Sequence, residues 1–172
     1  MNCLNLLDID SEIKFPEFKH LIRVDNIYVG AAITSARQIE ILKSLGVTVV
    51  VNLQNIKKTP FNDEEEFNKY GLGYKYFPIK DLSKIDFNFL QKFGELINYK
   101  TQKFFLYSLT GDRAAALLAL NSCLVCGHPK TRAMEFGIKL GVRHQETINI
   151  MEKLFFNESK VDLEKTDKSH VV

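Results

Sequence analysis

Short apolar runs alternate with helical patterns along most of this 172-residue chain. The runs are only a few residues long and are rich in β-branched and aromatic side chains, as is typical of strands. Strands that alternate with helices predict an α/β fold in which helices flank a central, mostly parallel sheet. The expected strands cover residues 26–33, 47–53, 74–79 and 103–107.

The segments between and after these runs have apolar residues at helical spacing, and the last third of the chain is expected to be helical. Ser35 is placed to cap the first helix, and Gly46 is placed to end it. The expected helices lie within residues 35–46, 63–71, 83–99, 114–126, 131–142 and 144–156.

The length of the chain fits a single domain with tails. We expect residues 1–20 to form a lead-in and residues 21–156 to form the domain. Residues 157–172 are charged and lack periodicity, so we expect them to form a flexible tail.

The overall charge and the apolar runs argue against two classes of partner. A net charge of +2 is too small to predict binding to nucleic acid or to an anionic membrane. No apolar run is long enough to span a bilayer. The first residues, MNCLNLLDIDSEIKF, carry acids and no basic region, which does not fit a secretory signal peptide.

The cysteines bear on redox compartment and on metals. Three cysteines, an odd number, argue against a disulfide framework, so a reducing cytoplasm is expected. Cys123 and Cys126 lie in an apolar helical segment, where they are expected to fill core space. His128 is close, but a fourth zinc ligand is not evident. We therefore expect no metal and no cofactor.

The segment FFLYSLTGDRAAALLAL, residues 104–120, predicts a buried strand, a tight glycine turn and a helix. The first N–H groups of such a helix have no internal partner, and the helix dipole adds to their attraction for an anion. Gly111 allows a backbone conformation that a Cβ would obstruct, and Arg113 offers a planar fork to a phosphoryl group. The alternative is a plain strand-to-helix turn, with Ser108 or Thr110 as its cap and Arg113 on the surface.

The stretch SLTGDR resembles the phosphate-binding loop of the cysteine-dependent protein tyrosine and dual-specificity phosphatases, Cys-x-x-Gly-x-x-Arg. It looks most similar to a bacterial branch with the shorter loop Cys-x-x-Gly-x-Arg. NIYVGAAITSARQIEILKSLGVTVVVNLQ is similar to the family's first strand–helix–strand unit, and YFPIKD resembles the strand before the general-acid loop. The resemblance spans about residues 22–155. It implies a dual-specificity-phosphatase-like fold and hydrolysis of phosphorylated proteins or small phosphomonoesters.

The resemblance also implies roles for individual residues. Ser108 stands at the position of the nucleophilic cysteine, Arg113 at that of the phosphate clamp, and Asp81 at that of the general acid. Asp86 is the alternate acid, although it also suits the first turn of a helix. A phosphate or sulfate ion would be held by the loop residues Leu109, Thr110, Gly111, Asp112 and Arg113.

Two departures from the family pattern affect the expected chemistry. Asp112 puts a negative charge beside a bound dianion, which weakens binding unless the carboxylate turns away or pairs with a neighbour such as Arg113. The hydroxyl of Ser108 is far less acidic than a thiol and needs an adjacent base to act as a nucleophile. No histidine has a spacing that suggests such a base, so we expect phosphate binding with very low turnover.

Three interpretations stay open at this point. The chain is an active phosphatase in a Cys-to-Ser form, or a natural pseudophosphatase that binds a phosphorylated partner without turnover. The third is rhodanese-like sulfur transfer, because the shortened loop also resembles the six-residue loop of rhodaneses. The missing thiol counts equally against this third interpretation, and the rest of the chain fits it less well.

Overall fold

The computed structural model describes residues 3–4, 9, 13–56 and 64–168 and contains a five-stranded sheet. The strand order is β1-β2-β5-β3-β4. The pairs β2–β5, β5–β3 and β3–β4 are parallel, whereas β1 is antiparallel to β2. This arrangement confirms the predicted α/β fold with a mostly parallel sheet. The strands are β1 (Leu21–Val24), β2 (Ile27–Ala31), β3 (Val49–Asn52), β4 (Gly73–Tyr76) and β5 (Phe104–Ser108).

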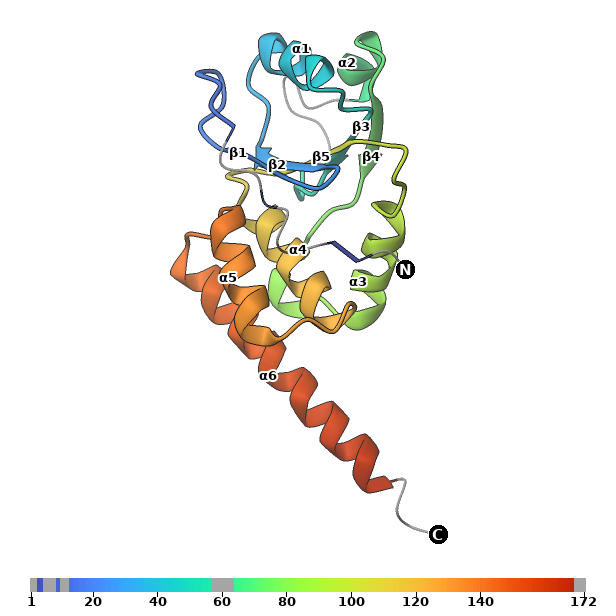
Figure 1. Ribbon diagram of the computed structural model, residues 1–172, viewed down its shortest axis with the longest axis vertical. Helices are drawn as coiled ribbons and strands as arrows, with labels where there is room; N and C mark the ends of the chain where they lie inside the picture. The colour runs from blue at the N-terminus through green and yellow to red at the C-terminus, as the bar shows by residue number, and fades with distance from the viewer. Residues whose placement is uncertain (1–2, 5–8, 10–12, 57–63, 169–172) are drawn as a thin grey trace.

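Helices cover both faces of the sheet. Figure 1 shows α1 and α2 on one side and α3 to α6 on the other. Ser35 caps α1 as predicted, in a capping box with Gln38. The helices are α1 (Ala36–Ser44), α2 (Glu64–Lys69), the 3-10 helix η1 (Leu82–Lys84), α3 (Phe87–Leu96), α4 (Asp112–Leu124), α5 (Lys130–Leu140) and α6 (Gln145–Lys168).

The side chains of β5 alternate between two hydrophobic cores, as a strand covered on both faces requires. Phe105 and Tyr107 belong to the core beneath α1 and α2, whereas Phe104 and Leu106 belong to the core around α4. Ser108 is the next residue on the α4 side. The strand therefore delivers Ser108 to the face where its own following helix packs.

The helix α4 is apolar around most of its circumference, and such a helix belongs in the interior. Every residue from Ala114 to Cys123 is buried. The helix packs beneath β5 and beside α3, α5 and α6, so its first turn is fixed in position relative to the sheet. The loop between β5 and α4 is thus held between two buried elements.

Strand β1 is the one element of the sheet that the sequence analysis did not anticipate. It pairs with β2 through a tight turn in which Asp25 adopts φ 52. Aspartate tolerates this left-handed conformation better than most residues do, which suits a hairpin turn. The start of the predicted domain at residue 21 coincides with the start of this strand.

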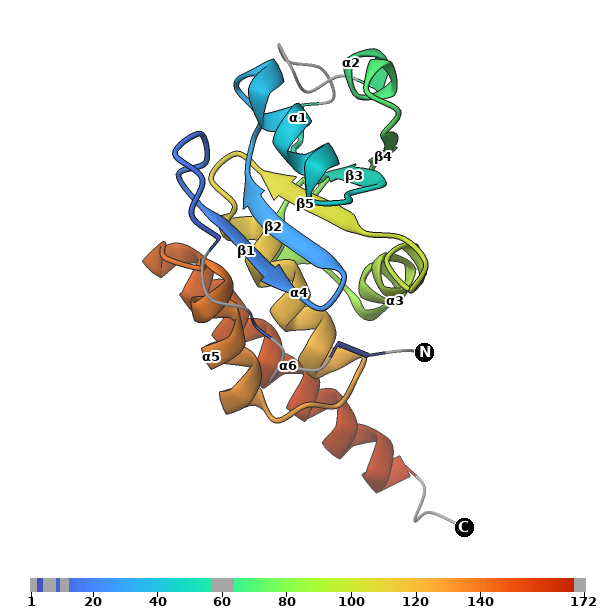
Figure 2. The same ribbon diagram turned by 45° about the horizontal axis from the view of Figure 1, so that its top comes forward.

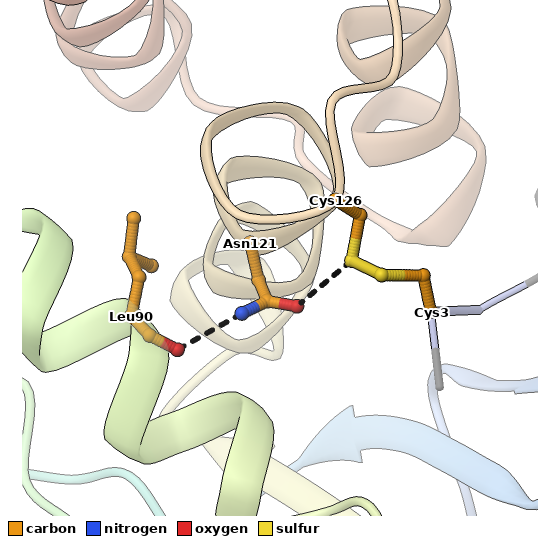
Figure 3. Close-up of a disulfide and its surroundings, with 4 residues drawn as sticks. All are labelled: Cys3, Leu90, Asn121 and Cys126. Atoms are coloured by element: carbon orange, nitrogen blue, oxygen red, sulfur yellow. Dashed lines mark hydrogen bonds between the residues drawn. A yellow bond between two sulfur atoms is a disulfide. The ribbon is translucent and has the colours of Figure 1, made fainter. Parts of the chain in front are cut away.

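The expectation that the chain has no disulfide is wrong. Cys3 is bonded to Cys126, just after the C-terminal end of α4, as Figure 3 shows. Cys123 is outside this disulfide and is buried, as expected for a core residue, whereas Cys126 does not fill the core. The two bonded cysteines are 123 positions apart, so only the fold brings them together. Disulfides are typical of oxidising compartments, and a cytoplasmic location therefore stays a prediction.

Part of the N-terminal lead-in packs onto the domain. The N–H of Ile13 donates to the carbonyl of Leu21, and Phe18 is buried in the core beneath α1. His20 is also buried, and its Nε2 donates to the carbonyl of Leu140 at 2.7 Å. The lead-in is therefore tied to the end of α5.

Helix α6 continues to Lys168, beyond residue 156, where the sequence predicts the start of a tail. Several residues of the segment, among them glutamate, lysine and leucine, favour helix, so the helix can continue without an apolar face. Figures 1 and 2 show the C-terminal half of α6 projecting from the rest of the chain. The flexibility of residues 157–172 stays a prediction, and residues 169–172 lie outside the described part.

Candidate functional site

The loop between β5 and α4 turns on Gly111, which has φ 85 and occupies the N-cap position of α4. An added Cβ would lie 3.1 Å from both the carbonyl carbon and the carbonyl oxygen of Gly30 on β2. Both the positive φ and the lack of room for a Cβ beside Gly30 therefore require glycine at this position. The N–H of Gly111 donates to the carbonyl of Ser108 at 3.3 Å, which closes the turn.

Ser108 lies at the base of this loop and is 3 % exposed. Its Oγ accepts a hydrogen bond from the N–H of Ala114 at 3.3 Å. The N–H groups of Asp112 and Arg113 come before the first bond within the helix, which Ala115 donates to Gly111. The start of α4 thus directs its dipole toward Ser108, in the arrangement that favours an anion.

A cavity of about 560 Å³ opens over this loop. It lies beyond the carboxyl ends of β3 and β5, where open α/β sheets bind their ligands. Four elements of the chain contribute to it: the end of β3, the loop, the first turn of α4 and the start of α6. The lining residues are Leu53, Gln54, Asn55, Ile56, Ser108, Leu109, Thr110, Asp112, Arg113, His144, Gln145, Glu146 and Thr147.

The predicted loop residues meet at this cavity. Its lining includes Ser108, Arg113 and three of the four residues between them, while Gly111 is buried behind it. Arg113 is exposed, so its guanidinium is available to a ligand from solvent. Gln54 is 9 % exposed, and its Oε1 has no hydrogen-bond partner within the described part of the chain. It adds a polar group to the cavity lining.

Asp112 turns its carboxylate toward the segment between α5 and α6. Its Oδ1 accepts hydrogen bonds from the backbone N–H of Arg143 at 2.6 Å and of His144 at 3.1 Å. It also lies 3.0 Å from His144 Nδ1. Burial alone would raise the pKa of this carboxyl, but the hydroxyl of Thr147 and the two N–H groups hold the pKa below its ordinary value. The partner is thus His144 and not Arg113.

Arg143 also reaches the loop, since its guanidinium donates to the carbonyl of Thr110 at 3.3 Å. The sequence analysis identified neither Arg143 nor His144 as part of the site. They lie about 30 residues after the loop, and no periodic pattern links them to it. The short turn at Gly141, which follows α5, is what brings them beside Asp112.

Asp81 lies outside the cavity lining, at the N-cap of η1. Its Oδ1 accepts hydrogen bonds from the hydroxyl of Ser83 at 2.6 Å and from the N–H of Ser83 at 3.0 Å. These two bonds lower the pKa of the carboxyl, and Arg113 adds a smaller electrostatic effect in the same direction. Asp86 caps α3 by accepting from the N–H of Phe89 at 2.8 Å, as a helix-start residue does.

Tyr107, which precedes Ser108, points to the opposite face of the sheet. Its ring is fully buried and stacks on Phe105, with the ring centroids 5.5 Å apart. Burial raises the pKa of its hydroxyl. Tyr107 therefore belongs to the core and takes no part in the cavity.

Two further properties concern the described residues alone. No three or more His, Cys, Asp or Glu side chains among them are grouped so as to hold a metal ion. None of their helices is both long enough and apolar enough to cross a membrane.

Comparison with known proteins supports the fold. No family model and no curated protein matches the chain. Among solved structures, P. aeruginosa TpbA, as a Cys-to-Ser form with bound phosphotyrosine, has a TM-score of 0.65 and 15% identity, covering 87% of this chain and 96% of that one. The core catalytic domain of the PP-IP phosphatase SIW14 from S. cerevisiae, in complex with citrate, has a TM-score of 0.61 and 16% identity, covering 91% and 96%.

A third structure, the active form of Tk-PTP, has a TM-score of 0.59 and 16% identity, covering 75% of this chain and 90% of that one. The chain therefore has the fold of the cysteine-dependent protein tyrosine and dual-specificity phosphatases, as the resemblance of its loop predicts.

Proposed function

We propose that this chain binds phosphomonoesters of the phosphotyrosine or dual-specificity type in the cavity over the β5–α4 loop. One observation carries the proposal. Ser108 and Arg113, at the positions of the family's nucleophile and phosphate clamp, line the same cavity, and the start of α4 lies between them. The loop residues 109–113 surround the phosphoryl group, which a free phosphate or sulfate ion would mimic.

Ser108 limits the chemistry that is possible after binding. In the family mechanism the loop amides and the arginine stabilise a thiolate, which attacks phosphorus. A hydroxyl is not ionised by the same environment, and here it is a buried acceptor for the N–H of Ala114. The chain is thus a phosphatase-like protein with its nucleophile replaced, and its own turnover is very low.

The rim of the cavity favours a substrate with an apolar group next to the phosphate. Leu109 is 74 % exposed and Ile56 is 61 % exposed, and both line the cavity. An aromatic ring would cover these side chains and remove apolar surface from water. This supports an aryl phosphate, such as a phosphorylated tyrosine of a protein, over a simple alkyl phosphate.

A second candidate is a binding module that holds a phosphorylated partner without turnover. The observation that favours it is the position of Asp81, which lies outside the cavity lining and whose hydrogen bonds to Ser83 lower the pKa of its carboxyl, which disfavours the protonated form that a general acid needs. Rhodanese-like sulfur transfer is a third possibility for the same loop. It is tested by sulfur-donor turnover in the Ser108→Cys variant.

Hydrolysis of an aryl phosphate tests the proposal. The native chain, the Ser108→Cys variant and that variant with Arg113→Ala are compared. We expect the cysteine form to exceed the native chain by at least about 10³-fold, and the arginine replacement to remove most of this gain. If the cysteine form is folded and silent but still binds phosphate, the binding-module function holds in place of the enzyme.

A further inference from the structure

A histidine and a carboxylate form a pair at the edge of the cavity. The side chain of Asp112 is 3 % exposed, and that of His144, just before α6, is 60 % exposed and lies with Nδ1 3.0 Å from Asp112 Oδ1. Within the described part of the chain, Nε2 of His144 makes no hydrogen bond. The carboxylate thus fixes one ring nitrogen, and the other ring nitrogen is left for a ligand.

Asp112 Oδ1 is bound without the imidazole, because the backbone N–H groups of Arg143 and His144 both donate to it. The buried Oδ2 has no hydrogen-bond partner within the described part of the chain. A side chain that served only to cap Asp112 would be expected to be buried with it. The imidazole instead lies at the cavity wall that also contains Ser108 and Arg113.

We propose that His144, held at Nδ1 by Asp112, is the group that transfers protons to and from a phosphomonoester bound in this cavity. The inference rests on the proposed function and assigns the proton transfer to His144 in place of Asp81. His144 lines the cavity, whereas Asp81 lies outside its lining and accepts two hydrogen bonds from Ser83.

The step is written for the Ser108→Cys form. The thiolate forms a bond to phosphorus, the bond from phosphorus to the ester oxygen breaks, and that oxygen takes the bond's electron pair and a proton from Nε2. Neutral His144 then takes a proton from a water molecule, whose oxygen attacks the phosphocysteine. The sulfur–phosphorus bond breaks and the thiolate is restored.

Charged groups of both signs lie on the elements around His144. Asp112 and Arg113 come from α4, and Arg143 and Glu146 come from the segment around the start of α6. Asp81 and Lys84 lie at η1, which packs against α6. A phosphate dianion in the cavity would add negative charge to this set.

The native chain permits a direct binding test by NMR of its histidine side chains with inorganic phosphate. His128 is the matched control, because it follows the far end of the 13-residue α4, about 20 Å from the loop. We expect phosphate to shift the ring nitrogens of His144 and the amides of residues 109–113, and to leave His128 unchanged. Shifts in the loop amides without a shift at His144 would overturn this inference and leave the proposed function standing. If neither His144 nor the loop amides show a saturable shift, this inference and the proposed function are both wrong.

The second test is kinetic and uses the Ser108→Cys form with either His144→Gln, Asp81→Asn or His128→Gln. We expect His144→Gln to lower kcat by about 10²-fold for an alkyl phosphate and much less for a nitrophenyl phosphate, whose leaving group needs no proton. Asp112→Asn should reproduce part of this effect, and His128→Gln should have none. If it is instead Asp81→Asn that lowers kcat much more for the alkyl phosphate than for the nitrophenyl phosphate, the assignment to His144 is wrong.

Discussion

Replacing Gly111 by alanine tests whether the loop is held by a close approach of strand β2. Gly111 has φ 85, and Gly127 has φ 75 and follows α4 at its other end. An alanine at either position must adopt the left-handed conformation, which disfavours the folded state by roughly 1–2 kcal/mol. Each alanine also restricts the unfolded chain, which offsets about 0.4–1 kcal/mol of that cost at both positions. Only at Gly111 does the new Cβ meet backbone, at 3.1 Å from two atoms of Gly30, whereas at Gly127 it meets nothing within 4 Å.

The difference between the two variants isolates the steric effect. Backbone atoms of a central strand cannot move as the end of a side chain can, so overpacking at Gly111 adds about 1–3 kcal/mol. We expect Gly127→Ala to lower the free energy of unfolding by about 1 kcal/mol and Gly111→Ala by about 2–4 kcal/mol. Urea unfolding followed by circular dichroism measures both, with the disulfide intact. Equal losses in the two variants would refute the close packing of the loop on β2.

Two further predictions concern the stability of the fold. Cys3→Ser removes a bond that joins residues 123 positions apart, and we expect the free energy of unfolding to fall by about 2–5 kcal/mol. Urea unfolding with and without reductant measures this loss. If the midpoint is the same for the variant and the native chain under both conditions, the disulfide does not form. The pKa of Asp112 is lowered in the folded state, so its stabilising effect is present above the unfolded pKa near 3.9 and is lost as the pH falls through the folded value. Between about pH 6 and pH 3 the native chain should therefore lose more stability than Asp112→Asn does, and parallel losses would contradict the hydrogen bonds assigned to this carboxylate.

Strands β2 to β5 were predictable because each of them has its own local sequence signal. The continuous β-branched run before Asn52 and the aromatic run before Ser108 predict strands covered on both faces, and both are buried throughout. Ser35 and Gly46 mark the ends of α1 in the sequence as they do in the structure. Strand β1 gave a weaker signal, because four residues before a two-residue turn are too few to show a period.

Only the part of the candidate site that is continuous in the sequence was predictable. The loop from Ser108 to Arg113 is continuous, and its glycine and arginine carry the pattern. His144 and Arg143 come from a turn about 30 residues later, and their approach to Asp112 depends on the packing of α5 and α6 beside α4. The bond between Cys3 and Cys126 is a more extreme case, since no local pattern encodes a contact across 123 positions.

The same contacts explain how a carboxylate can stand inside the proposed phosphate-binding loop. A free Asp112 would repel a phosphate dianion, because like charges at short range oppose each other's ionisation. Here the backbone N–H groups of Arg143 and His144 donate to Oδ1 of the carboxylate, and Nδ1 of His144 lies 3.0 Å from the same atom. The carboxylate thereby fixes the start of α6 over the cavity and brings the exposed imidazole of His144 to its wall. The residue that the sequence marks as unfavourable for phosphate binding is, in the folded chain, the residue that assembles the far side of the site.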